Sequence, residues 1–142
     1  MKKRTKHIIS MLTVAAFALF AVASTEEEAE QSISGKPVDF TMTARELFQA
    51  YDQNEIAADE KYEGKVLEIS GRVDDIGKDI TDTIYVTLDG GGEYGIFSVQ
   101  CFFADTHSGD AAKLSKGDAI TVKGLCNGMI GNVSVRGCSI VR

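Results

Sequence analysis

The stretch Gly64-Lys65-Val66-Leu67-Glu68-Ile69-Ser70-Gly71-Arg72-Val73 alternates between apolar and polar side chains. Leu67, Ile69, Gly71 and Val73 fall on one side, whereas Glu68, Ser70 and Arg72 fall on the other. A two-residue period is typical of a half-buried strand. Glycine weakens a flat strand but suits one that bends sharply. The stretch therefore predicts a bent first strand, and the rest of the chain is expected to wrap around it.

The same alternation recurs downstream in residues 84–89, 96–103, 117–124 and 133–141. Segments rich in turn residues separate these strands: 74–82 with four aspartates, 89–93, 105–116 and 126–132. A short helical piece is predicted at 110–114. Ahead of the first strand, Thr43-Ala44-Arg45-Glu46 has the pattern of a capping box, and a helix interrupted near Asn54 is expected to follow up to Gly64.

The order of these elements is helix, three strands, short helix, two strands. This order predicts a mainly β fold, a five-stranded OB-fold barrel with an N-terminal helix and a short helix between strands three and four. A plain five-stranded sandwich or another small barrel would be the alternative.

The first 23 residues have the composition of an export signal. A basic start is followed by an apolar run, and Ala21-Val22-Ala23 fits cleavage before Ser24. A retained membrane anchor is the alternative, but the run is short for a spanning helix. The cleavage region contains no cysteine, so a lipid anchor is not indicated. We therefore expect a signal peptide at 1–23, a flexible acidic spacer at 24–38, a domain at 39–142, and a periplasmic or extracellular protein without a stable membrane span.

Removing the signal makes the chain strongly acidic. The signal contains four of the 15 Lys and Arg residues and none of the 21 Asp and Glu residues, which leaves a net charge of −10. Such a protein repels phosphate backbones, so general nucleic-acid binding is disfavoured.

Three cysteines, Cys101, Cys126 and Cys138, fall in the predicted domain. An odd number allows at most one intramolecular disulfide. Cys126 and Cys138 flank the last hairpin and are the preferred pair. Cys101 with Cys138, or no bridge at all, are the alternatives. The spacing matches neither a zinc site nor a thioredoxin-like site.

No catalytic or metal-binding pattern is evident. The four aspartates of 74–82 lack the spacing of an EF-hand loop and are expected to be solvated. His107 stands between Asp105 and Asp110, but no nucleophile accompanies it, so a surface turn is expected. We therefore predict a protein that is not an enzyme and has no cofactor or metal.

A ligand of an OB-fold lies across the second and third strands of the barrel. Tyr85 and Phe102 on this face could stack on bases, although packing of Phe102 under the N-terminal helix, against Phe48 and Tyr51, is the preferred interpretation. The side chains expected on this face are Arg72, Tyr85, Thr87, Ser98, Gln100 and Phe102.

The segment from Tyr51 to Lys65 contains Tyr, Asn-Glu, Ala-Asp and Tyr-x-Gly-Lys in the order seen in the tRNA_anti-like family, which the chain resembles over about residues 43–142. Residues 99–103, Leu114-x-Lys116-Gly117-Asp118 and the cysteines at 126 and 138 are also similar. The resemblance implies an OB-fold similar to nucleic-acid-binding domains. It also implies export, although many members look like lipoproteins and this sequence lacks their lipid-acceptor cysteine.

Taken together, the sequence predicts an exported binding module whose partner is a small ligand or a protein. A small cationic ligand or a protein partner suits the acidic loops better than nucleic acid. The alternative is an envelope structural or stress-related interaction domain.

Overall fold

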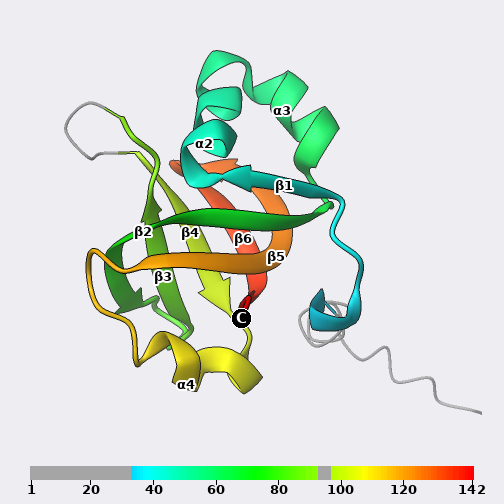
Figure 1. Ribbon diagram of the computed structural model, residues 1–142. Helices are drawn as coiled ribbons and strands as arrows, with labels where there is room; N and C mark the ends of the chain where they lie inside the picture. Colours follow the sequence, from blue (N-terminus) through cyan, green and yellow to red (C-terminus); the bar gives the residue numbers. More distant parts are fainter. Residues whose placement is uncertain (1–32, 93–96) are drawn as a thin grey trace, which may run out of the picture.

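The computed structural model describes residues 33–92 and 97–142, which form a closed barrel (Figure 1). The strand order is β1-β2-β3-β4-β6-β5, and a further pairing of β2 with β5 closes β2 to β6 into a five-stranded barrel. The strands are β1 (Phe40–Thr43), β2 (Val66–Lys78), β3 (Ile84–Asp89), β4 (Ser98–Phe103), β5 (Ala119–Ile130) and β6 (Asn132–Ile140). The helices are η1 (Ile33–Gly35), α2 (Ala44–Gln53), α3 (Glu55–Tyr62), η3 (Asp105–His107) and α4 (Ser108–Ala111).

This architecture confirms the predicted mainly β OB-fold, with a helix before the barrel and a short helix between its third and fourth strands. In Figure 1, α2 and α3 cover one end of the barrel and α4 lies at the other end. The core between them consists of apolar side chains that are almost fully buried, among them Leu67, Ile69, Val86, Leu88, Val99, Val122, Val133 and Val135.

Side-chain caps define the two helices at the covered end. The Thr43 hydroxyl accepts a hydrogen bond from the Glu46 amide at 3.1 Å, and the Glu46 carboxylate accepts one from the Thr43 amide at 2.8 Å. This confirms the capping box. The Asn54 side chain accepts a hydrogen bond from the Ala57 amide at 3.1 Å and starts α3. The predicted interruption near Asn54 is therefore the boundary between α2 and α3.

The long strand β2 connects the two halves of the sheet. Its first half pairs with β1 on one edge and with β5 on the other, and its second half pairs with β3. A bulge lies between Val73 and Asp75. A β-carbon added at Gly71 would lie 3.1 Å from the Ala44 β-carbon and 3.2 Å from that of Leu88. Gly71 therefore lets α2 and β3 approach β2 closely.

Two predicted loops are wrong in part, because they belong to strands. Residues 74–78, expected in a loop, continue β2, and residues 126–130, expected in a turn, continue β5 up to the turn at Gly131. Bulges explain both errors. They place turn-forming residues inside a strand, as at Gly128, whose φ is +80° between the paired residues Cys126 and Met129.

Of the predicted spacer, the structure describes residues 33–38, in which Ile33 packs on the barrel and residues 34–38 are exposed. Ile33 is 1% exposed, and the Lys123 ammonium donates hydrogen bonds to the carbonyls of Ser34, at 3.1 Å, and Lys36. The predicted signal peptide and the rest of the spacer lie outside the described residues. Within the described ranges, the helices are too short or too polar to cross a membrane.

The predicted Cys126–Cys138 disulfide is wrong in this structure, where all three cysteines are buried thiols. Cys126 is paired across the sheet with Val135, three residues before Cys138. Its sulfur lies 3.4 Å from the Tyr51 hydroxyl. The Cys138 thiol lies over Gly124 and donates a hydrogen bond to the Val135 carbonyl at 3.5 Å. The two thiols therefore contact different parts of the core.

Candidate ligand-binding face

The outer face of β3, β4 and β6 is arranged in rows by the strand register. Tyr85 is paired with Phe102, and Thr87 is paired with Gln100, which is paired in turn with Ser134 of β6. Alternation places these side chains on the side of the sheet opposite the buried residues. The register therefore brings together most of the side chains predicted for the ligand face.

An aromatic cluster of Tyr85, Phe102 and Arg136 dominates this face. The two rings meet edge to face with centroids 6.0 Å apart, and the Arg136 guanidinium lies 4.8 Å from the centre of the Phe102 ring. Phe102 is only 8% exposed. Arg136 therefore covers Phe102, and its exposed guanidinium lies on this face together with the half-buried Tyr85.

The preferred interpretation of Phe102 as packing under the N-terminal helix is wrong. Phe48 of α2 stacks on Phe97 with ring centroids 5.2 Å apart, and the Tyr51 hydroxyl contacts Cys126. Phe48 and Tyr51 therefore contact residues other than Phe102. Phe102 lies on the outer side of the barrel, where β4 places it.

Tyr85 packs against the backbone of β2 at Gly77. A β-carbon at this glycine would lie 2.6 Å from the Tyr85 hydroxyl oxygen and 2.8 Å from the ring carbon that bears it. The phenol of Tyr85 therefore lies over the backbone of β2 at Gly77, and a side chain at this position would displace it.

The polar side chains of the face differ in their availability. The Ser98 hydroxyl donates to the Asn132 side chain at 3.1 Å, and the Thr87 hydroxyl donates to the Asp75 carbonyl at 3.5 Å. Both residues are under 9% exposed. Gln100 and Ser134 are half-buried and remain accessible. Two of the predicted contact residues therefore support the sheet, and Gln100 is the one that can meet a ligand.

The turn between β2 and β3 is organised by Asp79. Its carboxylate accepts hydrogen bonds from the Thr81 hydroxyl at 2.7 Å, the Thr81 amide at 2.8 Å and the Thr83 amide at 3.0 Å. These bonds, that of the Thr81 hydroxyl above all, lower the pKa of the Asp79 carboxyl. Asp79 thus has a structural role, and no cluster of potential metal ligands occurs in the described part of the chain.

Exposed isoleucines border the face at both ends. Ile80 stands in the β2–β3 turn and Ile130 at the β5–β6 turn, and both side chains are almost fully exposed. These turns are the two loops that frame the ligand of an OB-fold.

The structure separates Arg72 from the other predicted contact residues. It pairs with Ala119 of β5, and its guanidinium donates to the Gly117 carbonyl at 3.1 Å. Arg136 takes the place expected for Arg72, and sequence reasoning missed it. Its alternation with Val133 and Val135, both buried, was the available signal, together with the proximity of the last strand to the third in this fold.

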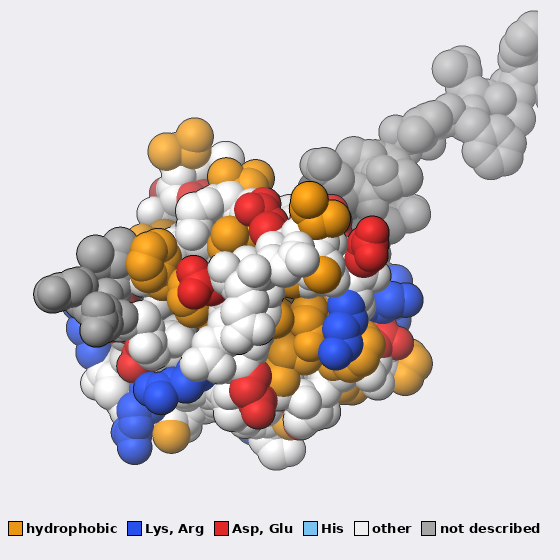
Figure 2. All heavy atoms as spheres, turned by 90° about the horizontal axis from the view of Figure 1, so that it is seen from above, with side chains coloured by type: hydrophobic (Ala, Val, Ile, Leu, Met, Phe, Trp, Pro, Cys, Tyr) orange, Lys and Arg blue, Asp and Glu red, His pale blue; other side chains and the backbone are white. Residues whose placement is uncertain are grey.

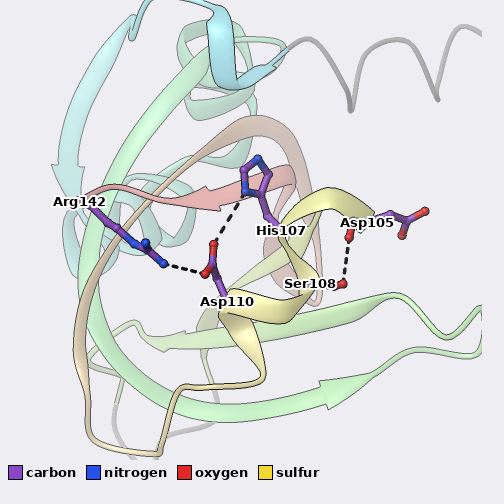
Figure 3. Close-up of polar contacts among 5 residues, drawn as sticks. All are labelled: Asp105, His107, Ser108, Asp110 and Arg142. Carbon is purple, nitrogen blue, oxygen red and sulfur yellow. Dashed lines mark hydrogen bonds and ion pairs between the residues drawn. The ribbon is translucent and has the colours of Figure 1, made fainter.

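The segment around His107 is a local polar network (Figure 3). The Asp110 carboxylate lies 2.7 Å from the Arg142 guanidinium and 3.9 Å from His107 Nδ1. The Ser108 hydroxyl donates to the Asp105 carbonyl at 2.9 Å and points away from the imidazole. This arrangement does not form a nucleophile–base pair, and it ties the C-terminal Arg142 to α4.

The fold and this face together define an OB-fold barrel with a partly aromatic outer face. The family model of tRNA_anti-like proteins matches residues 1–139, and the chain belongs to that family. No match was found among curated proteins.

Two solved structures are similar to this chain. The "putative nucleic acid-binding lipoprotein" from Klebsiella pneumoniae subsp. pneumoniae MGH 78578 is 22% identical. Its match has a TM-score of 0.60 and covers 75% of this chain and all of that one. The OBody AM3L09, solved bound to hen egg-white lysozyme, is 18% identical with a TM-score of 0.43 over 58% of this chain and 86% of its own.

Proposed function

We propose that this protein is an exported, non-enzymatic binding module whose ligand lies across the outer face of β3, β4 and β6. The observation that carries the proposal is the aromatic cluster, in which Tyr85 and the Arg136 guanidinium present planar groups at the centre of the face. Planar groups of this kind stack on rings and bases. Export is supported by the composition of residues 1–23.

Within this proposal, the ligand is a compact molecule with a planar group rather than a long nucleic acid. Arg136 is the cation at the centre of the face, and the carboxylate of Asp79 lies close enough to interact with it electrostatically. Figure 2 views the end of the molecule covered by α2 and α3, where acidic side chains are scattered and basic ones lie toward the sides. A nucleic-acid strand would need more cations along its path. The name of the Klebsiella neighbour nevertheless makes nucleotides the first ligands to test.

The test is a heteronuclear NMR titration of the mature protein with nucleosides, mononucleotides and a 12-nucleotide single strand at two salt concentrations. We expect the amides of β3, β4 and β6 to shift with compact ligands. Arg136→Gln and Tyr85→Ala should weaken binding about tenfold each, in the range found for loss of a stacking contact. Arg142→Gln is the matched control, because Arg142 is exposed and pairs with Asp110 of α4, away from the aromatic cluster.

Two outcomes would contradict this proposal. If a ligand changes only the chemical shifts of amides outside β3, β4 and β6, the proposed site is wrong. Tight binding of the single strand with a steep salt dependence, about −0.7 in log K per log salt for each phosphate contacted, would show that a polyanion is the ligand.

A protein partner is the second candidate, because Ile80 and Ile130 are exposed at the two ends of the same face. Exposed apolar side chains that border a polar surface are common at protein interfaces. Cross-linking in envelope fractions with the wild type and with Ile80→Asp/Ile130→Asp would test this function. A partner captured equally by both would contradict it.

A further inference from the structure

A groove of about 710 Å³ lies where β2 exchanges one neighbouring strand for another. β1 pairs with β2 as far as Ser70, and β3 pairs with it from Val73. The groove is lined by Ser70, Gly71 and Arg72 between these two pairings, and by residues of β5, the end of β6 and the start of α2. It is separate from the aromatic cluster, none of whose residues lines it.

Two arginines, Arg45 and Arg72, contribute to the groove, and both are exposed. Within the described residues, neither lies within ion-pair distance of a carboxylate. Arg72 donates to the Gly117 carbonyl at 3.1 Å, and Arg45 lies so close to Gly91 that a β-carbon there would be 2.4 Å from its Nε. Among the described residues, the groove thus contains two arginines that form no ion pair, in a protein that is acidic overall.

Two hydroxyl groups also line the groove. The hydroxyls of Ser70 and Thr121 are 2.9 Å apart, so one donates to the other and one hydrogen remains to be donated to a third group. Asp89 also lines the groove, where its carboxylate accepts a hydrogen bond from the Gly91 amide at 2.7 Å. The remaining negative charge of Asp89 favours a singly charged anion over a dianion such as phosphate.

Apolar side chains form the rest of the lining. Ile120, Ile140 and Val141 lie there, and Val141 is 37% exposed. Removing such side chains from water is favourable because of the hydrophobic effect. A ligand with an apolar part would cover them.

We propose that this groove is a second binding site, which takes a small amphipathic carboxylate. The carboxylate lies between Arg45 and Arg72 and accepts a hydrogen bond from the Ser70–Thr121 pair. A guanidinium group recognises a carboxylate through two parallel hydrogen bonds. The aliphatic or aromatic part of the ligand lies on Ile120, Ile140 and Val141.

The test is an NMR titration of the mature protein with octanoate, with acetate and inorganic phosphate as comparison probes. Octanoate should shift the amides of Ser70, Gly71 and Thr121. Acetate, which lacks the chain, should bind at least about tenfold more weakly, and the double variant Arg45→Gln/Arg72→Gln should lower octanoate affinity about tenfold or more. Both arginines are exposed, and thermal unfolding of the double variant would verify that its fold is retained.

Arg136→Gln is the matched control, because it removes one exposed arginine from the other face. It should leave octanoate binding unchanged, which also separates this site from the one proposed on β3, β4 and β6. The proposal is overturned if the double variant binds octanoate as well as the wild type does. It is also overturned if phosphate binds as tightly as octanoate, or if the shifts map to the aromatic cluster.

Discussion

At the scale of single residues, Gly71 has a steric role more than a bending one. The sharp irregularity of β2 is the bulge between Val73 and Asp75, while the missing side chain of Gly71 makes room for Ala44 and Leu88. Gly71→Val should therefore lower the free energy of unfolding by about 2 kcal/mol or more through overpacking. Urea unfolding monitored by circular dichroism would measure this.

Gly35→Val is the control for this change. No atom lies within 4 Å of the position of a β-carbon at Gly35, so this variant should stay within about 0.5 kcal/mol of the wild type. Equal stability of the two variants would mean that the packing around Gly71 yields easily.

Two buried groups that can lose a proton, the Tyr51 hydroxyl and the Cys126 thiol, should make the free energy of unfolding depend on pH. Burial raises the pKa of the Tyr51 hydroxyl and of the Cys126 thiol above their ordinary values of 10.0 and 9.0. The unfolded chain therefore loses these protons at lower pH than the folded chain does. The stability they contribute is fully present below about pH 9 and should decrease as the pH rises further.

Thermal unfolding between pH 7 and pH 11 would check this dependence. Tyr51→Phe and Cys126→Ala should each make the alkaline decrease shallower, because each removes one of the two protons. If both variants lose stability with rising pH as steeply as the wild type does, other groups cause the alkaline decrease.

At the scale of elements, the capping box starts α2 and also fixes one wall of the groove. Thr43→Ala removes the hydroxyl that accepts a hydrogen bond from the Glu46 amide, and it should lower the free energy of unfolding by about 1 kcal/mol. Thr41→Ala, an exposed position on the same short strand, should have a smaller effect. Urea unfolding of the pair would measure the difference, and no difference would mean that another group caps the helix.

The sequence predicted elements well where local signals decide them. The alternation of β3 gave its bounds, Ile84–Asp89, and the capping residues gave the start of α2. It failed where a distant segment decides. β1 is four residues long and exists because β2 lies beside it, and Asp75 stays in β2 because it pairs with Thr87.

The candidate face was predictable to the same degree. Alternation placed Tyr85, Gln100 and Phe102 on one side of the sheet, and the register confirms that they lie together. Which of them a ligand could reach depends on neighbours from β6. Arg136 covers Phe102, and the Asn132 side chain accepts the hydrogen bond of the Ser98 hydroxyl. These contacts join residues far apart in the chain, so no local pattern shows them.

At the scale of the whole molecule, export predicts the composition of the mature chain. Cleavage after Ala23 should give a protein that begins at Ser24 and has lost four basic residues. Intact-mass measurement and N-terminal sequencing of protein from the periplasm or the medium would show this. Protein that keeps residues 1–23 and stays with the membrane would indicate a retained anchor.

The closure of the barrel also bears on how such a chain could be exported. β2 lies early in the chain and completes its pairing only when β5, synthesised much later, reaches it. Contacts between distant segments form slowly, because the loop between them must be closed first. A nascent chain that has released β2 but not β5 cannot close its core. Because the barrel closes late, the polypeptide would stay unfolded, and so able to pass through a secretion channel, until nearly all of it has been made.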